Sequence, residues 1–349
     1  MNKVLILTDG KAGHENQSKA FARALGFEFD LVEVHFKSPF AKILSYLFDN
    51  LGIHCSSLFK SNNPSISQSN NPSISQSNNP YAAVLGTGSG TFYAAKTLAR
   101  KMGVKCGVVL YPRGYRISTF DCVLAPAFDR PASAPNVIEI PTNLVANDAA
   151  FYANGTKAFL ERYAPSAKPA VAVIVGGPNK CSTMSADWMK EQLTKLFAEF
   201  GHSISQSSNS PIEQSPNRTL EQSNTRTLEQ SNKVEFWVTT SRRTPPEVEA
   251  VVDSFPFDYK LLYSKDHFNP IPAFVKLAKT LCVTAESTGM LSESCTFGTA
   301  EVRALDNLNP GPHKFRRFVE DLIAGGYVNG ARKVDLSEQF ARARGLLSL

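Results

Sequence analysis

The sequence of 349 residues contains no C-x-x-C pair and no spacing of cysteine with histidine that is typical of a metal site. We therefore expect no bound metal. The six cysteines are interpreted as small buried apolar residues of a reducing compartment, and Cys106, Cys122 and Cys282 lie in or beside strand-like runs.

No apolar stretch approaches the roughly 20 residues that span a bilayer, and the apolar part of MNKVLILTDG is too short for a signal peptide. These absences predict a cytoplasmic protein, with contact to the inner face of a membrane left open.

Charged residues are also few, at 19%, whereas hydrophobic residues make up 42%. This composition is typical of folded domains, and the length suits two of them. The formal net charge of +6 permits an anionic ligand or an anionic membrane surface. Because no run of basic residues is interleaved with aromatic residues, we expect no nucleic-acid partner.

Two tracts contain almost no large apolar residues. Residues 61–80 repeat an eight-residue unit, SNNPSISQ, and residues 203–232 contain TLEQSN twice. Such segments bury too little surface to offset chain entropy, so both are predicted to be disordered inserts between strands.

Outside the inserts, strand-like and helix-like segments alternate through both halves. Apolar runs such as VLILTDG (4–10) and VAVIVGG (171–177) end in glycine turns and are followed by helical patterns. This alternation predicts an α/β fold of two Rossmann-like domains, whose parallel sheets face each other across a cleft. We expect an N-terminal domain over 1–160, a C-terminal domain over 170–312, and closing helices over 313–349.

Ligands of such sheets bind beyond the carboxyl ends of the strands. In the second half these ends carry GGPNK (176–180), TTSRRT (239–244) and TAESTG (284–289). Glycine amides, basic side chains and a helix N-terminus suit a diphosphate, and carboxylates suit ribose or sugar hydroxyls; tight turns and ordinary helix caps remain the alternative. The predicted nucleotide and phosphate ligands are Gly176, Gly177, Lys180, Ser241, Arg242, Arg243, Glu286, Ser287, Thr288 and Glu293.

In the first half, DGKAGHENQS (9–18) and GTGSGT (86–91) follow the first and third strands. His14 is the best candidate for a general base because imidazole titrates near neutrality, and Asp9 is the second candidate. The glycine turn is not a dinucleotide fingerprint, since its third glycine comes too soon. The loops expected on the acceptor side contribute Gly10, Lys11, Gly13, Gly88, Ser89 and Arg113.

The segment PFAKILSYLFDNLGI (39–53) is a predicted helix rich in large apolar residues and flanked by Lys37, Lys42 and Lys60. It is interpreted as a helix packed on the core or, alternatively, as a patch that binds a membrane surface.

The strings DGKAGHENQS, GGPNK, TTSRRTP and VTAESTGMLSE resemble those of the mitochondrial-fission "elongated mitochondria" (ELM) family and its bacterial relatives, over nearly the whole chain outside the inserts. The family is similar to glycosyltransferases of the GT-B type, with the acceptor on the first domain and the nucleotide-sugar on the second. The resemblance implies that His14 is the base and that Gly10 and Gly13 shape its turn. The chain departs from its relatives at residues 284–290, where an acid and a serine are lost, and at Phe128-Asp129, where relatives have His-Asp.

These observations predict a transferase that moves a sugar from a nucleotide-diphosphate donor to a lipid or cell-envelope glycan, without a cofactor. The alternative is a non-catalytic, membrane-associated scaffold that keeps the fold. A third, weaker hypothesis is an epimerase or an NAD enzyme, which the missing dinucleotide fingerprint disfavours.

Overall fold

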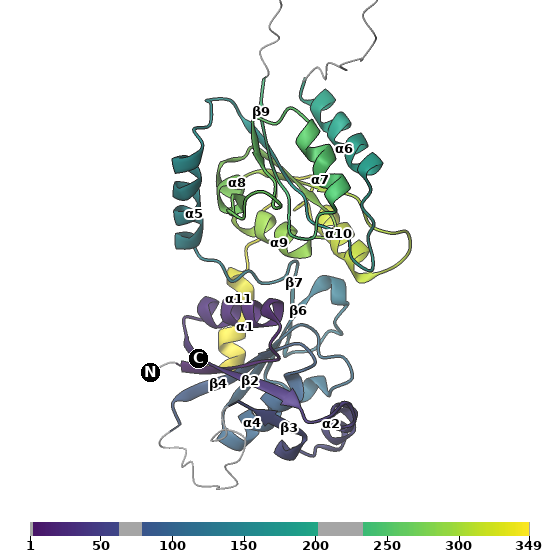
Figure 1. Ribbon diagram of the computed structural model, residues 1–349. Helices are drawn as coiled ribbons and strands as arrows, with labels where there is room; N and C mark the ends of the chain where they lie inside the picture. The colour runs from purple at the N-terminus through teal and green to yellow at the C-terminus, as the bar shows by residue number, and fades with distance from the viewer. Residues whose placement is uncertain (1–2, 63–78, 202–232, 349) are drawn as a thin grey trace, which may run out of the picture.

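The computed structural model describes residues 3–62, 79–201 and 233–348, and these form two parallel sheets with helices on their faces (Figure 1). The predicted insert at 203–232 lies outside these ranges, as does most of the insert at 61–80. At the described margins of that first insert, Ser61 ends a strand and Asn79 donates a hydrogen bond to the carbonyl of Met102. The predicted disorder therefore does not extend to these two residues.

The first sheet has seven strands in the order β3-β2-β1-β4-β5-β6-β7. All neighbours are parallel except the short edge strand β3, which pairs antiparallel with β2 and was not predicted. The strands are β1 (Lys3–Thr8), β2 (Glu28–Phe36), β3 (Phe59–Ser61), β4 (Tyr81–Thr87), β5 (Lys105–Val109), β6 (Cys122–Pro126) and β7 (Val137–Ile140). The helices of this part are α1 (Ala12–Ala24), α2 (Pro39–Leu51) and α4 (Phe92–Met102).

The second sheet has five parallel strands in the order β10-β9-β8-β11-β12. The strands are β8 (Ala170–Ile174), β9 (Glu235–Thr239), β10 (Tyr259–Leu261), β11 (Thr280–Thr284) and β12 (Glu301–Leu305), and the last of them was not predicted. The helices are α5 (Ala149–Arg162), α6 (Ala186–Glu199), α7 (Pro246–Ser254), α8 (Ile271–Leu277), α9 (Thr288–Phe297), α10 (Lys314–Ala324) and α11 (Ser337–Leu347). The predicted fold class, an α/β protein with two Rossmann-like sheets, is confirmed.

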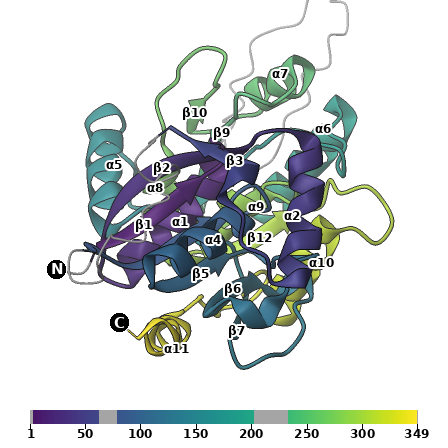
Figure 2. The ribbon, with the colours of Figure 1, turned by 90° about the horizontal axis from the view of Figure 1, so that it is seen from below.

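Two helices pack on a different sheet from the strands that precede them in the sequence. Helix α5 packs on α8 of the second sheet, and its Phe159 lies against Trp237 and Phe274. Helix α11 returns to the first sheet and packs on β5, β6 and β7 (Figure 2). We therefore propose that the chain passes between the domains at residues 141–148, before α5 rather than after it.

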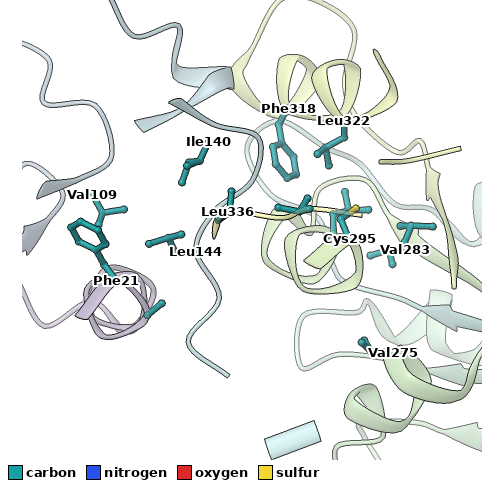
Figure 3. Close-up of a cluster of buried hydrophobic side chains, with 14 of the residues drawn as sticks. Phe21, Val109, Ile140, Leu144, Val275, Val283, Cys295, Phe318, Leu322 and Leu336 are labelled. Atoms are coloured by element: carbon teal, nitrogen blue, oxygen red, sulfur yellow. The ribbon is translucent and has the colours of Figure 1, made fainter. Parts of the chain in front are cut away.

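A continuous apolar cluster joins the two sheets (Figure 3). It includes Phe21 of α1, Leu144 of the crossover and Phe318 of α10. The ring of Phe318 packs edge-on against that of Phe128. Burial of this much apolar surface stabilises one mutual arrangement of the halves.

The interpretation of the six cysteines as small buried residues is confirmed for Cys106, Cys122, Cys282 and Cys295, whereas Cys55 and Cys181 are half-buried. Among the helices in the described ranges, none is long and apolar enough to cross a bilayer.

Candidate functional site

Each sheet has one point at which the strand order reverses, and the candidate residues lie at these two points. In the first sheet the reversal falls between β1 and β4, and in the second between β8 and β11. The loops after such neighbouring strands leave in opposite directions, which opens a crevice for ligands at their carboxyl ends. Asp9 and Gly88 follow β1 and β4, and Gly176 and Glu286 follow β8 and β11. The topology therefore brings together loops that are far apart in the sequence.

At the first point, Asp9 and His14 form a hydrogen-bonded pair. The Nδ1 atom of His14 lies 3.0 Å from Oδ1 and 3.1 Å from Oδ2 of Asp9, and Lys11 donates to Oδ2 at 3.0 Å. Burial alone raises the pKa of Asp9, but the hydrogen bonds and charges of Lys11 and His14 outweigh it, so this pKa lies below its ordinary value. A carboxylate held in this way fixes the imidazole so that Nδ1 carries the proton. The Nε2 atom has no hydrogen-bond partner in the described part of the chain and is free to accept a proton.

The predicted glycine turn closes over this pair. A side chain at Gly88 would place its Cβ 2.4 Å from Cε1 of His14, and one at Gly90 would meet Asp9 at 2.7 Å. Gly88 also has a φ of +83°, which side chains rarely adopt. Glycine is therefore required here so that the backbone can approach the imidazole. The turn's Ser89 accepts a hydrogen bond from Lys42 of α2 at 3.0 Å.

The other predicted acceptor-side residues are less closely involved. Gly10, with φ of +77°, lies against Glu33, and Gly13 is an exposed residue in the first turn of α1. Arg113 donates to the carbonyl of Asp129 and lies over the ring of Tyr111, so its guanidinium has partners other than the Asp9–His14 pair.

At the second point, the predicted amide cradle of Gly176 and Gly177 is already occupied. The amide of Gly176 donates to Oγ1 of Thr284 at 2.9 Å, and that of Gly177 donates to Oε1 of Glu286 at 2.7 Å. A phosphate would have to displace Thr284 and Glu286 to accept from these two amides, so direct binding by them stays a prediction. Glu286 is likewise engaged by the turn rather than pointing toward a ribose. Its other oxygen, Oε2, is buried without a hydrogen-bond partner among the described residues.

The TTSRRT loop packs directly on this turn. The hydroxyls of Ser241 and Thr244 donate to the carbonyl of Gly176 at 2.8 and 2.6 Å, so Ser241 is a structural residue of the loop. A Cβ at Gly177 would lie 2.2 Å from the carbonyl oxygen of Arg243, which explains why glycine stands at this position. The two strand ends are therefore locked together by their own side chains.

The cationic side chains of this region remain available. Arg242, Arg243 and Lys180 are exposed, and their charged ends form no ion pair within residues 3–62, 79–201 and 233–348. The backbone of Arg243 touches Gly177, which places its side chain at the rim of the turn. These three residues supply uncompensated positive charge next to the second reversal point.

Helix α9 begins at this rim, and its first turn is not capped by a side chain. Ser287 is the N-cap residue but makes no capping hydrogen bond, so the amides that open α9 keep their donor capacity. Thr288 is the first residue of the helix. The N-terminus of a helix attracts anions through these amides and the helix dipole.

Glu293 was predicted to bind a sugar hydroxyl, but its side chain is directed elsewhere. Its Oε1 accepts hydrogen bonds from the hydroxyl of Tyr152, at 2.9 Å, and from Asn147, at 3.3 Å. Burial raises the pKa of Glu293 above its ordinary value, although these two hydrogen bonds oppose the shift. It belongs to the contact between α9 and the crossover, together with Ser292, which accepts from the amide of Asn143.

Several contributors were not predicted from the sequence. Thr284 and Thr244 hold the glycine turn, and Asn307 accepts a hydrogen bond from the amide of Glu286 at 3.3 Å. Thr244 lies in the TTSRRT loop directly after Arg242 and Arg243, whereas nothing in the local sequence marks Asn307. Asn307 also lines a hollow of about 270 Å³ with Thr183, Met184, Ser185, Trp188, Asp306, Leu308, Asn309 and Pro310.

Fold and site together define an α/β protein with two Rossmann-like sheets and a polar cluster at the reversal point of each. The chain belongs to the family described as mitochondrial fission ELM1, whose model matches residues 12–224 and 207–343. No curated protein matches the chain.

Solved structures give distant likenesses over the full length. The UDP-GlcNAc 2-epimerase from Neisseria meningitidis bound to UDP-GlcNAc is similar at 11% identity and a TM-score of 0.45, covering 99% of this chain and 97% of that one. MurG from Acinetobacter baumannii is similar at 12% identity and a TM-score of 0.44, covering 100% and 91%. ADP-heptose LPS heptosyltransferase II from E. coli is similar at 9% identity and a TM-score of 0.41, covering 92% and 98%. The activities in these names belong to those proteins.

Proposed function

We propose that the protein is a GT-B-like glycosyltransferase, which moves a sugar from a nucleotide-diphosphate donor to a lipid or cell-envelope glycan. The observation that carries this proposal is that the two reversal points hold complementary groups. One holds an oriented imidazole with a free nitrogen, and the other holds unpaired cations beside an uncapped helix N-terminus. A transfer to an alcohol needs a base at the acceptor and positive charge at the leaving diphosphate.

In this mechanism the acceptor binds at the first domain. Nε2 of His14 takes the proton of the acceptor hydroxyl while the oxygen forms a bond to the anomeric carbon of the sugar. Asp9 holds the imidazole through Nδ1 and stabilises the imidazolium that results, rather than acting as the base itself. The bond from the anomeric carbon to the diphosphate oxygen breaks, and the nucleoside diphosphate leaves with the electron pair.

The second domain would bind this leaving group. Arg243, Arg242 and Lys180 neutralise its charge, and the amide of Thr288 at the start of α9 binds one of its oxygens, whereas the amide of Ser287 already donates to the carbonyl of Thr284. Preorganised donors of this kind stabilise the charge that develops in the transition state.

A non-catalytic scaffold is the second candidate, and Glu286 favours it. A carboxylate that occupies the glycine turn repels a diphosphate, and it also fills the amides that such a ligand would use. For the transferase, the diphosphate must therefore bind outside the turn, at the arginines and α9.

The test is a nucleotide panel with two point variants. We expect at least one nucleoside diphosphate or nucleotide-sugar at millimolar concentration to raise the Tm of the wild type, as preferential binding to the folded state requires. Arg243→Ala should weaken that binding at least tenfold. His14→Ala should leave it unchanged and abolish sugar transfer to a lipid-extract acceptor. Arg100→Ala, which removes an exposed arginine of α4, is the matched control and should behave as wild type.

Two results would contradict the proposal. If no nucleotide in the panel shifts the Tm, the scaffold replaces the transferase. If His14→Ala abolishes nucleotide binding while Arg243→Ala loses only turnover, the two roles have been assigned to the wrong domains.

A further inference from the structure

Helix α2 carries four of its large apolar side chains on its outer face. Among the large hydrophobic residues in the described ranges, four of the most exposed lie on this helix: Phe40 at 66%, Ile43 at 65%, Leu47 at 54% and Leu51 at 64%. Their spacing of three and four residues places them in one stripe along the helix. Ile53, just beyond the helix, is also exposed. The interpretation of 39–53 as a helix packed on the core is therefore confirmed for Leu44, Tyr46 and Phe48, which are half-buried against a core cluster, but it does not hold for the exposed stripe.

The opposite face of α2 explains this orientation. Its buried residues are Ala41, Ser45 and Asp49, which recur every four residues. Asp49 accepts from Lys96 of α4 at 2.5 Å and from the amide of Arg116 at 2.6 Å. An unpaired buried carboxylate or lysine is costly, so this face must point inward.

A second contact of the same face fixes the helix further. The hydroxyl of Ser45 lies 3.0 Å from that of Tyr115, whose ring stacks on Tyr46. Rotating α2 to bury its apolar stripe would break all of these contacts. The stripe faces solvent because the polar face has specific partners inside.

The surroundings of the stripe are basic. Between residues 37 and 60 the chain has one acidic residue, Asp49, which is buried in its ion pair. Lys37 and Lys60 are exposed, without an acidic partner among the described residues, and the ammonium of Lys42 donates to the hydroxyl of Ser89. Lysines around an apolar stripe suit an anionic lipid surface, where the alkyl stems lie on the apolar layer and the ammonium groups meet the headgroups.

We propose that α2 binds flat in the interface of an anionic lipid bilayer, with Phe40, Ile43, Leu47 and Leu51 inserted among the acyl chains. A helix of this kind lies in the plane of the interface instead of spanning the membrane. A second copy of the chain is the poorer occupant, because a two-fold contact through this face would bring its uncompensated lysines together. In Figure 1, α2 lies at the margin of the first domain, away from the second sheet.

This placement deepens the proposed function, on which the following assignment rests. The bond from Lys42 to Ser89 ties α2 to the glycine turn that covers His14. A membrane-bound α2 would therefore hold the imidazole beside the headgroup layer, which favours a lipid as the acceptor over a free glycan.

The test is cosedimentation of the full-length protein with vesicles, without any nucleotide. One set of vesicles is phosphatidylcholine alone, and the other is phosphatidylcholine with about 30% phosphatidylglycerol, an anionic lipid that attracts basic segments. Wild type should bind the anionic vesicles and lose binding as salt rises. Ile43→Ser with Leu47→Ser should reduce the partition coefficient at least tenfold, and Lys37→Gln with Lys60→Gln should reduce it on anionic vesicles only.

The matched control is Leu160→Ser with Ile323→Ser, which removes two exposed apolar residues from α5 and α10. It should bind as wild type, and all variants should keep the Tm of wild type because the altered residues are exposed. Equal binding by the α2 variant and the control would overturn the proposal. So would a wild-type dimer in sedimentation that the α2 variant abolishes. Because nucleotide is absent, failure of the proposed transferase activity leaves this result unchanged.

Discussion

The buried ion pair beneath α2 gives the sharpest prediction about stability. Asp49 and Lys96 are 2% and 3% exposed, and the carboxylate of Asp49 also accepts a hydrogen bond from the amide of Arg116. The ammonium further lies 4.0 Å from the ring centre of Phe120. Asp49→Ala removes the counter-ion and the acceptor and leaves the lysine in place.

We expect Asp49→Ala to destabilise the protein by about 3–5 kcal/mol, because it leaves an uncompensated buried charge. With about 2–4 °C of Tm per kcal/mol for a domain of this size, the Tm should fall by roughly 6–20 °C. Asp49→Ala with Lys96→Met should recover much of the loss, since a pair of apolar residues replaces the charge. Differential scanning calorimetry of the three proteins measures this.

The loss should also depend on pH. Burial lowers the pKa of Lys96, although Asp49 opposes the shift, so removing Asp49 lowers it further. The unfolded chain then binds more protons than the folded variant above that lowered pKa, and stability rises with pH up to the ordinary lysine value. The deficit of Asp49→Ala should therefore narrow between neutral pH and about pH 10. A Tm change below about 2 °C, or a double variant no more stable than the single one, would show that Lys96 does not need Asp49 as a counter-ion.

Three further predictions concern the reversal points. Gly88→Ala forces a side chain into a φ of +83° and against His14, so it should lower the free energy of unfolding by about 1–2 kcal/mol and abolish sugar transfer. Nucleotide affinity, measured by calorimetric titration, should stay unchanged. Normal sugar transfer by this variant would contradict the prediction. Glu286→Gln removes the negative charge but keeps an acceptor for the amide of Gly177, so nucleotide affinity should rise several-fold; a weaker complex would show that the carboxylate helps binding. Glu293→Gln should raise the Tm at pH 7 but not at pH 4. The pKa of Glu293 is raised in the folded state, so the wild type loses stability as pH rises from the ordinary glutamate pKa to the raised pKa, and glutamine avoids this loss. Equal Tm gains at both pH values would exclude ionisation of Glu293 as the cause.

The alternation of strands and helices was readable from the sequence because each buried parallel strand is a continuous apolar run that ends in a turn. Two short strands were missed for physical reasons. The edge strand β3, Phe59–Ser61, has only three residues, and β12, Glu301–Leu305, alternates charged and apolar residues at the sheet edge. The role of α5 was also not predictable, since its packing on α8 depends on the tertiary fold.

Among the site residues, the loops were predicted but the direction of individual side chains was not. Spacing placed His14 and Asp9 in one turn, and the structure pairs them. Spacing could not show that Glu286 turns back onto Gly177, because residues 109 positions apart meet only through the order of the strands. The sequence also could not show that the apolar stripe of α2 faces outward. That orientation depends on the burial of Asp49 against Lys96, which lies on another helix.

The proposed transferase depends above all on binding of a nucleoside diphosphate at the second reversal point. Its most direct test is a crystal structure of the protein soaked with a uridine diphosphate compound. We predict that the diphosphate lies at the first turn of α9, with the guanidinium of Arg243 within hydrogen-bond distance of its oxygens. A diphosphate bound on another surface, or none in the crystal at millimolar ligand, would contradict it.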